Sequence, residues 1–233
     1  MLIITLANCG GGHKITAAQA AALPSTSLAF PSEKENSYQN PSYTALNNHP
    51  GATAGFMAAA VGGGAIGGIA GALIIEGVQA VAQNKFEKQH PMEIAKINSA
   101  MRGKVSKPLH QSLKKHLAKN RFFASRMKAD SSTPIVTRVH SYGLLRVAPV
   151  GNSADGKTDD FYSAHVLMTV SLKNEDKKEL GGLGPVTGVS NTKARLADFA
   201  NSPSLVNKAL AEAADAAAAE FSNRMQKATA ELP

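Results

Sequence analysis

The pattern of hydrophobic and polar positions divides the chain into successive segments. Residues 10–50 are mainly polar and rich in Ser, Thr, Asn, Pro and Gly, a composition typical of a disordered tether. Residues 51–75 carry no charge, and their helical pattern continues to residue 89, before His90 and Pro91 end it. Residues 90–233 mix helical and strand periods. We therefore expect a disordered tether (10–50), a glycine-zipper hydrophobic helix or helical hairpin (51–89) and a basic domain (90–233).

Two stretches of that domain have the period of amphipathic helices. Apolar residues recur at every third or fourth position from Ile94 to Leu117, which predicts a helix with one buried stripe. Pro108 should kink or divide this helix. The last helix has clear start signals, with Ser202 as its cap and Pro203 at the first helical position.

Between these helices the pattern is that of strands. Residues 134–147 are rich in β-branched and aromatic side chains, and we expect Gly143 to mark a bulge. Residues 161–172 alternate, so that one side of this strand faces the helices. A third, weaker strand is expected between residues 177 and 189. The predicted fold class is α+β, with a short antiparallel sheet of about three strands packed by two helices.

The apolar segment has small residues at every fourth position, which would form a smooth strip along one face of a helix. These positions are Gly51, Gly55, Ala59, Gly63, Gly67 and Gly71. As one helix, Gly51–Ile75 would be roughly 37 Å long, enough to cross a bilayer core. Its eight glycines cost roughly 8 kcal/mol of helix stability relative to Ala. A single helix of this composition would therefore be only marginally stable as a membrane span.

We expect this ladder of small residues to be a helix-packing surface that drives self-association or binds a partner helix. A close alternative breaks the segment at residues 62–64 into a helical hairpin that packs on the domain. A flexible linker is the third interpretation, although large apolar residues such as Ile66 and Leu73 are unusual in linkers.

Basic residues are concentrated in one block of the chain. Between His90 and Lys128 there are ten Lys or Arg residues and one acid, Glu93, while the whole chain has a formal charge of +8. Such a block attracts phosphate groups of lipid or nucleic acid. The candidate contacts with an anionic surface are Lys104, Lys107, Lys114 and Lys115. The plainer interpretation is a solvated helix face.

Known catalytic and metal-binding motifs are missing from the sequence. The seven histidines lack ligand spacing, and the single cysteine cannot form a zinc cluster. His140 and His165 lie on neighbouring predicted strands and could meet, but such pairs are more often surface residues. Phe122 and Phe123 beside basic residues are the one nucleic-acid signal, and we expect both rings to enter the core instead. We predict a protein without enzymatic activity, cofactor or metal, for which nucleic acid is an improbable partner.

The start of the chain resembles the end of a bacterial lipoprotein signal peptide. A short apolar run leads to Leu6-Ala7-Asn8-Cys9, followed by three glycines. In that pattern residues 1–9 are the remnant of a signal peptide with its lipobox, and Cys9 is the lipidation site. Asn8 departs from the small residue usual there, and no basic region precedes the apolar run. The alternative is an incidental free or buried thiol.

The order of segments resembles that of uncharacterised envelope lipoproteins of Gram-negative bacteria. The resemblance rests on the Cys9 segment, the polar tether, the glycine zipper, the basic helix and a Val-rich meander containing Tyr142-Gly143-Leu144, closed by an Ala-rich helix. It implies a membrane-anchored accessory or structural protein whose domain faces the periplasm, with the outer membrane favoured. Expected partners are membrane lipid, an envelope protein and a second copy.

A bitopic membrane protein with a cytoplasmic basic domain is the alternative to the lipoprotein. Few basic residues precede Gly51 and many follow Ile75, which is the asymmetry that the positive-inside rule requires for a cytoplasmic C-terminus. Most of the basic block nevertheless lies at least about 20 residues beyond the apolar segment, where the rule has little weight. The lipoprotein interpretation is therefore preferred.

Overall fold

The structure is a computed structural model. It describes residues 16–21, 23–33, 38–46, 83–147, 160–173, 179–182 and 184–230. The predictions for Cys9 and for the ladder from Gly51 to Gly71 lie outside the described residues.

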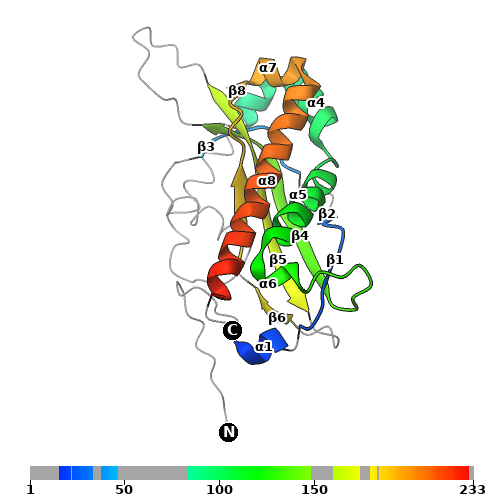
Figure 1. Cartoon of the computed structure of the whole chain (residues 1–233). Helices are drawn as coiled ribbons and strands as arrows, with labels where there is room; N and C mark the ends of the chain where they lie inside the picture. The colour runs from blue at the N-terminus through cyan, green and yellow to red at the C-terminus, as the bar shows by residue number, and fades with distance from the viewer. Residues whose placement is uncertain are drawn as a thin grey trace, which may run out of the picture.

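A long antiparallel hairpin forms the centre of the sheet (Figure 1). Its two strands are β4 (Pro134–Val147) and β5 (Phe161–Lys173), which pair from Ile135 opposite Leu172 to Val147 opposite Phe161. Short antiparallel strands follow one another along the free edge of β5: β6 (Glu179–Gly182), β7 (Val186–Val189) and β8 (Ala194–Arg195). Short parallel strands do the same along β4: β1 (Ser27–Leu28), β2 (Ser32–Glu33) and β3 (Ser42–Leu46). The sheet is therefore mixed.

Helices form a layer on one face of this sheet (Figure 1). They are α4 (Pro91–Met101), α5 (Ser106–Lys119), α6 (Arg121–Ala124), α7 (Leu196–Asn201) and α8 (Pro203–Ala228). A short helix α1 (Ala17–Ala21) precedes β1, and residues 83–89 are also helical. α8 contacts β5 and β7 directly, while α5 packs against α8. Within the described residues no helix has the length and apolar content needed to cross a membrane.

The register assigns alternate residues of the strands to the helix layer. Val166 pairs with Tyr142 on β4 and with Gly188 on β7, and all three face the helices. α8 passes so close to β7 that a Cβ atom at Gly188 would lie 2.0 Å from the carbonyl oxygen of Ala213. The small residues in the middle of α8 permit this approach, because a bulkier side chain would hold the helix away from the sheet.

The predicted α+β class is confirmed, but the expected three strands and two helices are too few. The described residues add strands β1, β2, β3 and β8, and the helical part has several elements. Part of the polar stretch expected as a disordered tether forms β1–β3. These short strands have no alternating apolar pattern of their own. Backbone hydrogen bonds to β4, such as Ala29 N–H to the carbonyl of Ile135 at 3.1 Å, hold them in place.

The expected bulge at Gly143 is wrong, because the register shifts at His140 instead. Gly143 is required for a different reason: a Cβ atom there would lie 2.4 Å from the carbonyl oxygen of Gln39. The helix is divided as predicted, but the break comes before Pro108. The helices separate between Arg102 and Val105, and Pro108 lies in the first turn of α5, where no intrahelical N–H donor is needed.

The start of the last helix is confirmed. The backbone N–H of Leu205 donates to the hydroxyl of Ser202 at 3.3 Å, and Pro203 follows at the first helical position. The third strand expected between residues 177 and 189 is present as two pieces, β6 and β7, which both pair with β5.

Candidate functional site

The turn between α4 and α5 is fixed to the sheet by one strong contact. Gly103 adopts a φ of 70°, a conformation that other residues rarely adopt. Its N–H donates to the hydroxyl of Tyr142 at 2.7 Å, and the N–H of Lys104 donates to the carbonyl of Met101. The hydrogen bond to Tyr142 therefore fixes the turn, with its basic residues Arg102 and Lys104, against strand β4.

Arg102 is positioned further by Tyr38. Its guanidinium carbon lies 5.4 Å from the centre of the Tyr38 ring, within the range of a cation–π contact. The Tyr38 hydroxyl donates to the side-chain oxygen of Asn98 at 2.6 Å. Burial raises the pKa of Tyr38, as does Tyr142, while Arg102 opposes them. The phenol thus stays a neutral donor, and residue 38 joins the N-terminal segment to α4.

The N-terminal end of α5 has a concentration of positive potential. Val105 offers no side-chain cap, and the first turn contains no acid. Lys104 and Lys107 are exposed there, and neither has an ion-pair partner among the described residues. Cations at a helix N-terminus are unfavourable for the helix itself, since the dipole already places positive charge there. The same arrangement suits a bound anion.

The four lysines predicted as anionic-surface contacts are not equivalent. Lys107 and Lys114 are seven residues apart on α5, so they share one exposed face, with Lys104 at its start. Lys115 instead points to α8, where its ammonium nitrogen lies 3.0 Å from a carboxylate oxygen of Asp215. Lys104, Lys107 and Lys114 therefore lie together on one exposed face, and Lys115 does not belong to it.

Asp215 ties α5 to α8 through two residues. The same carboxylate oxygen lies 3.0 Å from Lys115 and 3.0 Å from Nε2 of His116. Desolvation raises the pKa of Asp215, but the hydrogen bonds and charges of Lys115 and His116 together outweigh it and lower that pKa below its ordinary value. This pairing is structural, because it fixes how α5 lies on α8.

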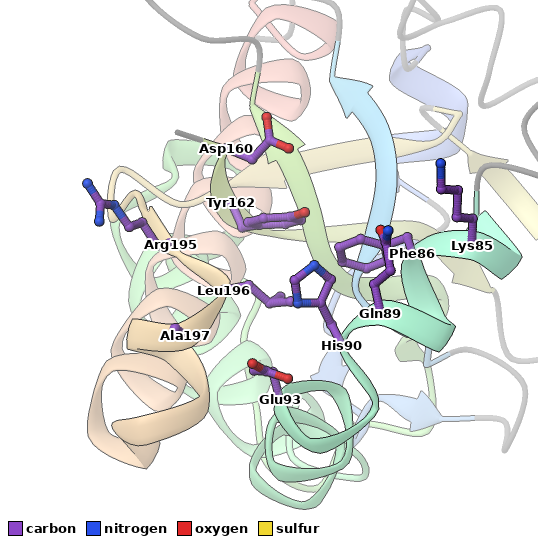
Figure 2. A pocket seen from close by; sticks show the side chains of 10 residues that line it. All are labelled: Lys85, Phe86, Gln89, His90, Glu93, Asp160, Tyr162, Arg195, Leu196 and Ala197. Atoms are coloured by element: carbon purple, nitrogen blue, oxygen red, sulfur yellow. The ribbon is translucent and has the colours of Figure 1, made fainter. Parts of the chain in front are cut away.

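A cleft of about 570 Å³ lies where helical residues 83–89, α4, β5 and α7 meet. Figure 2 shows His90 between Glu93 and Tyr162, while the side chain of Arg195 extends away from the group. Phe86 stacks on Tyr162 with 6.0 Å between ring centres. Charged side chains of both signs line the cleft, and Arg146 holds Asp160 at 2.5 Å. Its walls suit a polar group better than an apolar ligand.

Sequence reasoning missed both the cleft and the role of Arg102. The cleft residues come from three stretches of the chain (85–93, 160–162 and 195–197) that meet only in the folded domain, so no spacing could reveal the cleft. Arg102 belongs to the basic block, but nothing in its neighbourhood in the sequence indicates the contact with Tyr38.

His140 and His165 do not meet. Nε2 of His140 lies 2.8 Å from the hydroxyl of Thr169, whereas Nδ1 of His165 lies 3.1 Å from the carbonyl of Gly143. Burial lowers the pKa of His165 to about 4, with the Gly143 carbonyl acting in the opposite sense. His165 is therefore a neutral, buried residue near pH 7.

Phe122 and Phe123 enter the core, as expected. Their exposed fractions are 6% and 0%, and the rings pack edge to face at 5.1 Å. Arg126 lies over the outer ring, with its guanidinium carbon 4.3 Å from the centre of Phe122. Neither ring offers a free face on which a nucleic-acid base could stack.

Comparisons with known proteins leave the family open. The chain matches no protein-family model, and no curated protein sequence matches it. Among the described residues there is also no group of three or more His, Cys, Asp or Glu side chains that could hold a metal ion.

Proposed function

We propose that this protein is an anchored accessory lipoprotein of the bacterial envelope, whose basic domain contacts an anionic surface. The surface is that of membrane lipid, and the contact comprises the turn and the exposed face of α5. We define this basic face as Arg102, Lys104, Lys107 and Lys114. Anchoring through Cys9 would keep the domain close to the headgroups, so that individually weak charge contacts act at high effective concentration.

One observation carries the lipid contact: the N-terminus of α5 has no side-chain cap and no acid, yet it is flanked by exposed lysines. A lysine close to an anionic bilayer contributes about 1 kcal/mol to binding. Removing two such charges should therefore weaken binding by on the order of 30-fold.

Vesicle co-sedimentation tests this contact. The protein is mixed with phosphatidylcholine vesicles that contain or lack phosphatidylglycerol, at two salt concentrations. We expect binding that needs the anionic lipid, falls with salt and is lost in Lys104→Gln/Lys107→Gln. The control is Lys208→Gln/Lys227→Gln on α8, which removes the same charge elsewhere. If the control loses as much binding as the α5 variant, only net charge acts and the basic face is not a site.

The anchor is tested separately in cells. Labelling with a fatty-acid probe should mark the wild-type protein and not Cys9→Ser. An unlabelled wild-type protein would remove the lipoprotein half of the proposal while leaving the vesicle result unaffected.

The bitopic alternative retains support from the distribution of basic residues along the chain. A reporter fused after Pro233, active only in the periplasm or only in the cytoplasm, separates the two. Activity in the periplasm supports the lipoprotein, and activity in the cytoplasm supports the alternative.

A further inference from the structure

The cleft in Figure 2 exists because the chain bends at His90. The ring of Pro91 disfavours a helical conformation at the residue before it, so the helix over residues 83–89 ends there and α4 begins. His90 accordingly has a φ of −127° and a ψ of 42°, while its backbone hydrogen-bonds to both helices. The bend therefore places Lys85 of the first helix and Glu93 of the second along one cleft.

The cleft has a partly apolar wall. Phe86 and Tyr162 are 6% and 2% exposed, and their rings stack with 6.0 Å between centres. Leu196 of α7, which is 6% exposed, lines the same cleft. The volume of about 570 Å³ falls in the range of pockets that hold small molecules, roughly 300–1,000 Å³. A ligand with a compact apolar part can therefore contact this wall.

Two opposite charges in the cleft do not pair with each other. Lys85 is exposed and Glu93 is half-buried, and neither side chain makes a hydrogen bond or an ion pair with any residue in the described part of the chain. Figure 2 shows them on opposite sides of His90. The cleft therefore presents an ammonium and a carboxylate that are separated by more than the length of an ion pair.

The other charged side chains of the cleft are arranged differently. The guanidinium of Arg146 donates to Asp160 at 2.7 Å and offsets its charge. The side chain of Arg195 extends away from the group in Figure 2. A ligand with a single charge would match either Lys85 or Glu93 and leave the other unpaired beside it. A ligand that carries both charges matches both.

We propose that the cleft binds a short zwitterionic peptide, whose N-terminal ammonium contacts Glu93 and whose C-terminal carboxylate contacts Lys85. Each additional residue of a peptide separates its two charged ends by up to about 3.8 Å, so a dipeptide or tripeptide reaches both side chains more readily than a free amino acid does. An apolar side chain of the peptide lies against Phe86 and Tyr162. The cleft shares no residue with the basic face, so this inference does not depend on the proposed lipid contact.

Calorimetric titration of the full chain with three matched probes tests the proposal. The probes are glycyl-phenylalanine, its N-acetyl derivative, which lacks the ammonium, and its C-terminal amide, which lacks the carboxylate. We expect the unmodified dipeptide to bind and each derivative to bind on the order of tenfold more weakly, because each loses one charged contact. Inorganic phosphate and methylamine, which carry charge of one sign only, should bind more weakly than the dipeptide.

Two variants assign each charge of the peptide to one side chain. Glu93→Gln should weaken binding of the dipeptide on the order of tenfold and leave binding of the N-acetyl derivative unchanged, since the ammonium is already missing there. Lys85→Gln should weaken the dipeptide in the same way and leave the amide unchanged. The controls Asp130→Asn and Lys88→Gln remove the same charges at exposed positions outside the cleft and should bind like the wild type.

Four results overturn the proposal. They are a wild-type protein that does not bind the dipeptide at millimolar concentration, derivatives that bind as tightly as the dipeptide, phosphate or methylamine that binds as tightly, and control variants that lose as much affinity as the cleft variants. Circular dichroism checks the folding of each variant. The comparison of the probes on the wild-type protein decides the proposal even where a variant is unstable.

Discussion

The contact between α8 and β7 allows a sharp test of how the helix layer lies on the sheet. Gly188 faces α8 from the middle of β7, and an added Cβ would lie 2.0 Å from the carbonyl oxygen of Ala213 and 2.3 Å from the backbone nitrogen of Ala217. Both are backbone atoms of a long helix, so neither can rotate away as a side chain would. Gly188→Ala therefore has to push α8 from the sheet or bend β7.

The cost follows from that geometry. Adding one methyl group to a packed core costs about 1–3 kcal/mol, and the upper end applies where the obstacle is backbone. The gain from replacing Gly in a strand, roughly 0.5–1 kcal/mol, offsets only part of it. We expect Gly188→Ala to lower the free energy of unfolding by about 2 kcal/mol, and Gly188→Val by more, since two further methyl groups enter the same space.

Urea unfolding followed by circular dichroism measures this loss, and a thermal melt should show a Tm lower by roughly 4–8 °C. Gly184→Ala is the control, because it adds the same methyl group just before β7 where no atom lies within 4 Å. Because the φ of Gly184 is 72°, Gly184→Ala should lower the free energy of unfolding by roughly 1 kcal/mol through backbone strain alone. A Gly188→Val variant as stable as the wild type would refute the close seating of α8 on β7.

Two further predictions concern buried polar groups. His165 has an ordinary pKa of 6.5 and a folded pKa of about 4, so between these values the unfolded chain binds a proton that the folded chain excludes. The free energy of unfolding should therefore fall by up to roughly 3 kcal/mol as the pH drops from 6.5 to 4. Urea unfolding should show that this free energy depends less on pH in His165→Gln than in the wild type. An equal pH dependence in the two proteins would contradict the burial of His165. Tyr142→Phe removes the acceptor for the Gly103 N–H at 2.7 Å, so we expect a loss of about 1 kcal/mol and faster hydrogen exchange at Gly103, whereas unchanged exchange would show that the turn is held by other contacts.

The elements that could be predicted from the sequence are those with a strong local signal. The cap at Ser202 and Pro203 depends only on groups within one turn of helix. Strand β5 was expected at 161–172 and is found at Phe161–Lys173, because its alternation is long and regular. The helical stripe from Ile94 to Leu117 is buried at every expected apolar position.

The candidate site was predicted only in part. The exposed lysines of α5 follow from the helical period, since residues opposite a buried stripe face solvent. The pairing of Lys115 with Asp215 does not follow, because the two residues are 100 positions apart and meet only when α5 lies on α8. The anchoring of the turn by Tyr142 does not follow either, because Gly103 and Tyr142 are 39 positions apart and meet only in the folded domain.

The sequence by itself determined the α+β class, the starts and periods of the principal helix and strands, and the position of the basic block, because each depends on neighbours within one or two turns. Only the tertiary structure decided where the helix before α5 ends, that the bulge lies at His140, and that polar residues near the N-terminus become strands. Those features depend on backbone groups brought together from distant parts of the chain, where β4 offers unpaired edge groups to β1–β3.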